Sequence, residues 1–310
     1  MPKPTFINIG PGRCATSWLF QLLQSHPEIA LSKVKETEYF NTNLANGQDW
    51  YESQFEQPSD ESAAKAIGEF SANYYLSPEI ASAIKAYDPN LKLIINVRDP
   101  FDLLKSFHSF GIRRGLEIGE IGNCLNEPIG PIMGSGYSHR KKRGELTTCD
   151  DATLLESVCL EDRLKPFFEL FPSDQIYLFV VERLSNEHSQ VLEEVFEFLG
   201  VDATYQPEGA EEVINSAITP KSKLLARAAT STSFLLRRMG ANGLLTRLHQ
   251  SKLIKRLLYS ENNAGGEKSE TATSAKPGIR HLLDSDSRSI IENQIELLKT
   301  RIPDLREWWS

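Results

Sequence analysis

Residues 5–18, TFINIGPGRCATSW, join a short apolar run to a turn with two glycines and the start of a second apolar segment. The run from Thr5 to Gly10 is typical of a buried strand, and Thr16–Ser25 is typical of a helix that ends before His26-Pro27. A helix that starts directly after a strand and a glycine turn offers free backbone N–H groups to an anion. The stretch therefore predicts an α/β fold with a phosphate-binding loop.

Outward from this stretch, strands and helices alternate along the chain. Further strands are predicted at Ala66–Ala72, Leu91–Arg98 and Gln175–Val181, and helices are predicted from Pro78, from Pro100, after an Asn186 cap, and over about 286–301. Such alternation predicts βαβ units, a mostly parallel central sheet and three layers, with ligands bound beyond the carboxyl ends of the strands.

Charge is distributed unevenly over the 310 residues. The formal net charge of -8 argues against a nucleic-acid-binding protein. Residues 213–260, however, contain nine Lys and Arg and no Asp or Glu. Leucines at roughly helical spacing in this span predict a cationic amphipathic segment. It could contact an anionic membrane peripherally or bind an acidic glycan, or it could be a packed helix with a solvated basic face.

The cysteines and the hydropathy pattern bear on location. Cys14, Cys124, Cys149 and Cys159 match neither a zinc motif nor a disulfide framework, so no metal site is predicted. The N-terminal residues run directly into the first predicted strand, and no apolar run approaches the roughly 18 residues of a membrane span. We therefore expect a cytoplasmic protein.

The turn after the first strand has the chemistry of a phosphate site. Gly10 and Gly12 permit a sharp turn, Arg13 adds a guanidinium, and Thr16 and Ser17 add hydroxyl groups. An ordinary strand–helix turn capped by Thr16 is the alternative. The GK[ST] ending that holds ATP and magnesium is absent, which disfavours an ATPase or kinase.

The stretch IGPGRCATSWLFQLLQSHPEI (residues 9–29) resembles the 5′-phosphosulfate-binding segment of sulfotransferases that use 3′-phosphoadenosine 5′-phosphosulfate (PAPS). The resemblance implies a fold of the P-loop type with a helical C-terminal portion. It also implies that the donor is bound by Gly12, Arg13, Cys14, Ala15, Thr16, Ser17 and Trp18. Ala15 stands where the family usually has glycine. We expect Ala15 to be helical, so that Thr16 falls within the first turn.

A second segment, LKLIINVRDPFDLLKSFHSF (residues 91–110), resembles the 3′-phosphate-binding segment of the same family. The resemblance implies that Arg98 and Ser106 bind the 3′-phosphate of PAPS. It also implies that PAPS becomes adenosine 3′,5′-bisphosphate when it has donated its sulfuryl group. From the residues alone, Arg98 could instead pair with Asp99 or Asp102. Leu103 occupies a position where the family often has arginine.

Two further segments extend the resemblance. GEFSANYYLSP (residues 68–78) is similar to a strand-and-turn segment of glycosaminoglycan-type members, with Phe70 in place of a common lysine. Residues 275–309 are similar to the end of bacterial members, where a basic loop covers the nucleotide. Lys276 and Arg280 are the candidate residues of that loop, and solvated loop charges are the alternative.

The catalytic base is expected in KVKETEYF (residues 33–40), which resembles the segment that carries the family's catalytic glutamate. The match implies Glu36 as the base, Lys35 as a neighbour that can bind substrate or donor, and Arg13 as the stabiliser of the leaving phosphate. In a strand-like segment, Glu36 and Glu38 would face one side and Lys35 the other. Glu38 and His108 are alternative bases, and exposed loop charges without a catalytic role are the alternative for the segment.

The acceptor is predicted only by class, as the hydroxyl, or less favoured amine, of a glycan, glycolipid or small metabolite. Trp50 and Tyr51 could stack on sugar rings or pack in the core. We expect one domain over residues 1–310, comprising a nucleotide-binding half (5–110), a variable surface loop (111–150), the remaining sheet and helices (151–212), and a basic helical region with a flexible loop and a C-terminal helix (213–310).

Two other functions remain open from the sequence. One is a P-loop kinase-like transferase that uses ATP. The other is a non-catalytic nucleotide-binding protein of the same fold, which the departures at Ala15, Phe70 and Leu103 support.

Overall fold

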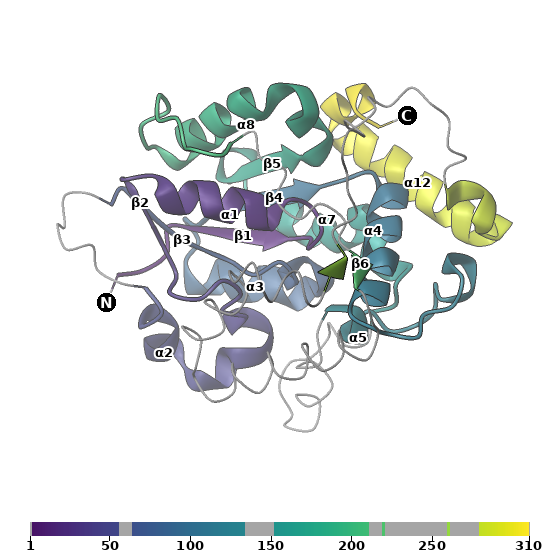
Figure 1. Cartoon of the computed structure of the whole chain (residues 1–310). Helices are drawn as coiled ribbons and strands as arrows, with labels where there is room; N and C mark the ends of the chain where they lie inside the picture. Colours follow the sequence, from purple (N-terminus) through teal and green to yellow (C-terminus); the bar gives the residue numbers. More distant parts are fainter. Residues whose placement is uncertain are drawn as a thin grey trace.

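A sheet of five parallel strands, in the order β2-β3-β1-β4-β5, forms the centre of the molecule (Figure 1). The computed structural model describes residues 2–55, 64–133, 152–210, 219–220, 259–260 and 279–309. The strands are β1 (Phe6–Gly10), β2 (Ile29–Leu31), β3 (Ala66–Phe70), β4 (Lys92–Val97) and β5 (Ile176–Val180). The predicted α/β fold with a mostly parallel sheet is confirmed, and the four predicted strands are present. The three-residue strand β2 was not predicted.

The two faces of the sheet bury different helices, because successive strand residues point to opposite faces. Helices α1 (Thr16–Ser25) and α8 (Leu184–Leu199) pack with Phe6, Ile94 and Phe179 on one face. The other face, which includes Ile7, Leu93 and Ile95, is covered by α3 (Pro78–Tyr87), α4 (Pro100–Arg113), α7 (Leu160–Leu170) and α12 (Ser285–Arg301). The result is the predicted three-layer arrangement.

Shorter elements surround this frame. They include α2 (Gln48–Glu52), α5 (Gly130–Met133), a π-helical turn at Tyr39–Asn43, several 3-10 turns, and an antiparallel pair formed by β6 (Thr219–Pro220) and β7 (Tyr259–Ser260).

Two predictions of local structure were wrong. Helix α8 begins at Leu184 rather than after Asn186, with a non-helical residue at Glu187 (φ -129°). Within the predicted surface loop that starts at residue 111, several side chains belong to the core. Ile121, Leu125, Ile129 and Ile132 are each at most 5% exposed, because they supply the apolar surface that covers the end of α4.

The C-terminal segment is attached to the carboxyl end of the sheet. Trp309 is buried, and its Nε1 donates to Glu182 Oε2 at 3.1 Å. The other oxygen of Glu182 accepts from the backbone N–H of Asp99 at 2.9 Å, directly after β4. Burial raises the pKa of Glu182. One carboxyl group therefore links the chain end to the strand that leads to Arg98.

Several predictions lie outside the described residues. They concern the loop over 134–151, most of the basic span 213–260, and the loop 261–278 with Lys276. Over the part of the chain that the structure describes, no helix has the length and apolar character needed to cross a membrane.

Candidate active site

The loop after β1 is held against the segment after β3. Gly10 has φ +90°, and a Cβ at this position would collide with the carbonyl of Ala72, so only glycine fits there. The backbone N–H of Gly12 donates to the same Ala72 carbonyl at 3.0 Å. The loop therefore lies beside β3 and leads directly into α1.

Ala15 is not helical, which corrects the expectation from the sequence. It has φ 57° and ψ 16°, in the left-handed region, and occupies the N-cap of α1 without a side-chain capping bond. Arg13 is also left-handed, with φ 66°. Thr16 and Ser17 still lie in the first turn of α1, which contains no acidic residue. The first-turn N–H groups therefore face the loop, as an anion site requires.

Replacing Ala15 by glycine is expected to raise the free energy of unfolding by about 0.5–1 kcal/mol. A left-handed non-glycine residue costs about 1–2 kcal/mol, part of which the extra chain entropy of glycine offsets. Denaturant unfolding measures the change. The matched control is Ala86→Gly, at an exposed position of right-handed helix α3, which should lose about 1 kcal/mol. A loss of stability in the Ala15→Gly variant would contradict the left-handed assignment.

Two buried asparagines of the central sheet, which the sequence analysis missed, hold the loop after β1 by hydrogen bonds to its backbone. Asn96 in β4 donates through Nδ2 to the carbonyl of Cys14 at 2.7 Å, and accepts from Asn8 Nδ2 at 2.5 Å. Asn8 in β1 also accepts from the N–H of Gly10 at 3.2 Å. Both side chains are fully buried. Polar residues in the middle of apolar strands were the signal that could have revealed them.

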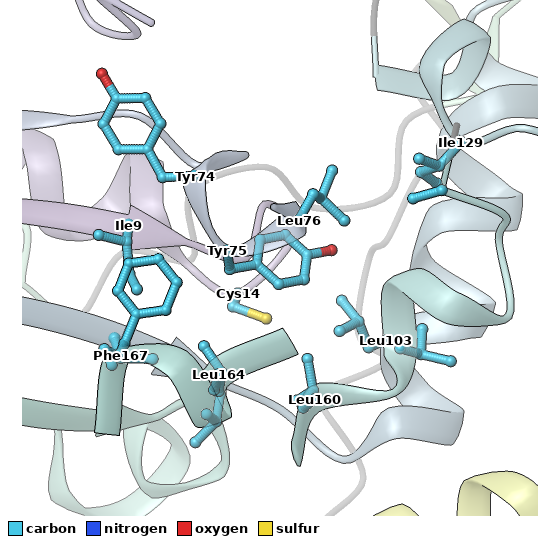
Figure 2. Close-up of a cluster of buried hydrophobic side chains, with 14 of the residues drawn as sticks. Ile9, Cys14, Tyr74, Tyr75, Leu76, Leu103, Ile129, Leu160, Leu164 and Phe167 are labelled. Atoms are coloured by element: carbon cyan, nitrogen blue, oxygen red, sulfur yellow. The ribbon is translucent and has the colours of Figure 1, made fainter. Parts of the chain in front are cut away.

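Cys14 and Trp18 point away from the loop. Figure 2 shows the Cys14 side chain among Tyr75, Leu103 and Leu160, inside the buried cluster. Burial raises the pKa of the Cys14 thiol. Trp18 is buried on the opposite face of the sheet, and its Nε1 donates to the Ala210 carbonyl at 3.1 Å. Each can therefore meet a donor only through its backbone.

Arg13 and Ser106 join the two segments predicted to bind phosphates. Arg13 Nε donates to Ser106 Oγ at 3.2 Å, across 93 residues of sequence. Arg98 Nη1 lies 3.5 Å from the Arg13 carbonyl oxygen. Burial, followed by the charges of Arg113 and Arg98, lowers the pKa of Arg13 to about 10. The site thus concentrates positive charge, and Arg113 is a member that the sequence analysis missed.

The alternative role for Arg98 as a partner of nearby aspartates is not what the structure shows. Asp99 caps α4, accepting from the N–H groups of Phe101 and Asp102 at 2.9 and 3.2 Å. Within the described ranges, no ion pair joins Arg98 to Asp99 or to Asp102. The guanidinium of Arg98 is instead directed at the Arg13 backbone.

Lys35 and Glu36 lie together at the start of α1. Lys35 Nζ is 3.1 Å from Ser17 Oγ, 3.4 Å from Thr16 Oγ1 and 3.2 Å from Glu36 Oε1. The expected strand-like alternation is wrong, because Glu36 (φ 69°) and Glu38 (φ 49°) are both left-handed. Glu36 is also bound to the segment after β3, with Oε2 3.4 Å from the N–H of Ala72. The structure therefore brings the predicted base to the predicted donor loop.

The two alternative bases have other contacts. Glu38 Oε2 accepts from Thr42 Oγ1 at 3.3 Å, and the Glu38 N–H donates to Ser71 Oγ at 3.0 Å. His108 Nε2 donates to the Gly119 carbonyl at 2.8 Å. Glu36 is paired with Lys35, which contacts the hydroxyls of Thr16 and Ser17 in α1.

The predicted sugar-stacking residues behave differently from one another. Tyr51 is fully buried, stacks on Tyr39 with ring centroids 4.3 Å apart, and donates its hydroxyl to Glu69 at 2.8 Å. Its predicted contact with substrate is therefore wrong, because no sugar ring can reach it. Trp50 is partly buried beside the same core. Arg280 lies 4.6 Å from the centroid of the Phe101 ring, next to the start of α4.

The sequence of this chain is similar to sequences of known sulfotransferases. The family model described as "Sulfotransferase domain" matches residues 3–234. The membrane-associated sulfotransferase kil1 of Dictyostelium discoideum is 39% identical over 110 residues, which are 36% of this chain and 23% of that protein. The human bifunctional heparan sulfate N-deacetylase/N-sulfotransferase 3 is 26% identical over 204 residues, 64% of this chain and 22% of that protein. The chain therefore spans less than a quarter of the length of these relatives.

A solved structure shows the same fold. The sulfotransferase from Alicyclobacillus acidocaldarius superposes with a TM-score of 0.54 at 20% identity, covering 83% of this chain and 100% of that chain. At this identity the likeness concerns the fold alone.

Proposed function

Because the chain belongs to the sulfotransferase-domain family, we propose that it transfers a sulfuryl group from PAPS to an acceptor hydroxyl. The observation that carries the proposal is the contact of Arg13 with Ser106. It joins a loop suited to a 5′-phosphosulfate to a helix suited to a 3′-phosphate, so one nucleotide with two phosphate groups can bind both.

The residues of the site suit such a donor. PAPS is strongly anionic, and Arg13, Arg98 and the first turn of α1 offer guanidinium groups and backbone N–H groups without an acidic residue in that turn. The loop needs no lysine–serine ending, because it has no γ-phosphate or magnesium to hold. Arg280, beside Phe101, is proposed to cover the nucleotide together with Lys276.

Sulfuryl transfer breaks the bond between sulfur and the oxygen of the 5′-phosphate and forms one between sulfur and the acceptor oxygen. The donor, when bound, supplies the sulfuryl group. Glu36 accepts the proton of the acceptor hydroxyl. Arg13 and the N–H groups at Thr16 and Ser17 stabilise the charge that develops on the leaving phosphate. Lys35, in contact with both hydroxyls and with Glu36, holds the base beside this loop.

The acceptor is proposed to be a glycan, a glycolipid or a small metabolite. A hydroxyl is the first choice. An amine is the second candidate, and the printed name of the human relative, an N-sulfotransferase of heparan sulfate, favours testing it. We further propose that residues 1–310 form one cytoplasmic domain, whose basic span 213–260 contacts anionic membranes. The nine positive charges of that span and the membrane association named for kil1 support this contact.

The test is transfer from labelled PAPS to a panel of glycans, glycolipids and small molecules that bear hydroxyl or amine groups. We expect label in at least one acceptor and release of adenosine 3′,5′-bisphosphate. Magnesium-dependent ATP turnover without sulfuryl transfer would establish a kinase-like enzyme instead. Binding of the bisphosphate without transfer to any acceptor would establish a non-catalytic protein.

A further inference from the structure

A fully buried carboxyl group lies behind the loop that carries Glu36. Glu69 in β3 accepts four hydroxyl hydrogen bonds, two at each oxygen. Tyr51 and Tyr74 donate to Oε1 at 2.8 and 3.0 Å. Ser71 donates to Oε2 at 3.0 Å, and Thr37 donates to the same oxygen. Glu69 and all four partners are buried, so this cluster is separate from the surface that a substrate could reach.

The four donors match the ionised form of Glu69. A carboxylate has about four acceptor sites, and here each is opposite a hydroxyl group. A protonated carboxyl would itself have to donate a hydrogen bond. One of the four hydroxyl oxygens would then have to accept this bond and could no longer donate to Glu69. Burial raises the pKa of Glu69 above its usual value, and the four hydrogen bonds donated to the carboxylate offset only part of this rise. The cluster is thus a complete acceptor–donor set that loses a bond when any hydroxyl is removed.

Two of the four hydroxyls belong to contacts that shape the Glu36 loop. Thr37 lies between Glu36 and Glu38, whose φ angles of 69° and 49° each cost about 1–2 kcal/mol. Ser71, while donating to Glu69, accepts from the N–H of Glu38 at 3.0 Å. The N–H of Glu36 donates to the carbonyl of Phe70 at 2.8 Å, next to Glu69 in the chain. Strained backbone of this kind persists where its surroundings over-determine it.

We propose that Glu69 is a positioning residue for the base. Through Thr37 and Ser71 it holds Glu36 and Glu38 in the left-handed conformation that places Glu36 against Lys35 and the start of α1. Glu69 does not touch a reactant. This inference rests on the proposed function, because the positioned group is the base of sulfuryl transfer. Displacement of a catalytic group by about 1 Å can cost about 100-fold in rate, so the loss of one anchor has a measurable effect.

The test compares two variants that each remove one hydroxyl from the same carboxylate. Thr37→Val releases the loop, whereas Tyr51→Phe leaves the loop contacts intact. For Thr37→Val we expect kcat to fall about 10–100-fold, with the affinity for adenosine 3′,5′-bisphosphate within about twofold of wild type. For Tyr51→Phe we expect a similar loss of thermal stability with kcat within about threefold. Thr37→Ser, which keeps the hydroxyl, should restore kcat to within about threefold.

A second measurement does not depend on activity. Amide hydrogen exchange at residues 36–38 should accelerate at least about tenfold in Thr37→Val and stay at the wild-type rate in Tyr51→Phe. If Thr37→Val does not fold, Ser71→Ala takes its place, because it removes the acceptor of the Glu38 N–H. For Ser71→Ala we expect the same fall in kcat and the same acceleration of amide exchange at residues 36–38.

Different results would overturn the positioning role of Glu69 and the proposed sulfuryl transfer. Equal loss of kcat in Thr37→Val and Tyr51→Phe, or full kcat in Thr37→Val, overturns the positioning role. Absence of sulfuryl transfer by the wild-type protein overturns the proposed function, and the exchange rates then decide the positioning role alone. Unchanged exchange at residues 36–38 in Thr37→Val overturns it.

Discussion

Replacing Arg98 by alanine is expected to weaken the binding of adenosine 3′,5′-bisphosphate by about 100-fold, or about 2.8 kcal/mol. Arg98 is partly buried at the end of β4, next to the Arg13 backbone, where a charged hydrogen bond to phosphate is only partly screened by water. Calorimetric titration of the folded variant measures the loss.

The control for this prediction is Lys105→Ala. Lys105 is exposed on α4, one residue before Ser106, so its removal changes the net charge equally without altering the site. We expect its affinity to stay within about twofold of wild type, since exposed charges contribute little. Equal losses in both variants would mean that Arg98 acts only through the general field of the protein.

Replacing Glu36 by glutamine is expected to lower kcat by about 100–10,000-fold while the affinity for the bisphosphate stays within about twofold. Glutamine has nearly the shape of glutamate, and its carbonyl can still accept from the N–H of Ala72, but it cannot take a proton at neutral pH. Steady-state transfer from labelled PAPS, together with calorimetry on the same preparation, separates the two quantities.

The competing bases provide the comparison. Glu38→Gln and His108→Asn should each lower kcat far less than Glu36→Gln does. The Glu38 side chain contacts Thr42 and the His108 side chain contacts Gly119, and neither partner belongs to the loop between β1 and α1. Full turnover in Glu36→Gln, with a large loss in one of the other two, would transfer the role of base to that residue.

The fold was largely readable from the sequence, since its signals are local. Helix α1 has the predicted bounds, Thr16–Ser25, because an apolar stripe begins after the glycine turn and His26-Pro27 ends it. The edge strand β2 was missed because three residues, Ile29–Leu31, show no usable periodicity. The burial of Ile121, Leu125, Ile129 and Ile132 was missed because the glycine- and proline-rich composition around them is typical of a surface loop.

The sequence predicted which residues meet at the site, but it did not predict the backbone conformation of the loops that carry them. The resemblance selected Arg13 and Ser106, and the structure brings them into contact. Ala15 was expected to be helical so that Thr16 would fall within the first turn, but contacts that only the folded chain makes, such as Asn96 with the Cys14 carbonyl, shape the loop before it. The left-handed Glu36 and Glu38 likewise lie in a loop with contacts that only the folded chain makes, from Thr37 to Glu69 in β3 and from the Glu38 N–H to Ser71 just after that strand.

We propose that the loop after β1 and the helix after β4 form one site for a nucleotide with two phosphate groups. The most direct test of this proposal is calorimetric titration of the wild-type protein with adenosine 3′,5′-bisphosphate and, in parallel, with adenosine 5′-monophosphate, which lacks the 3′-phosphate. We expect the bisphosphate to bind at least about 50-fold more tightly, because it alone of the two nucleotides has phosphate groups for both Arg13 and the Arg98–Ser106 side. Equal affinities, or no binding of the bisphosphate, would contradict it.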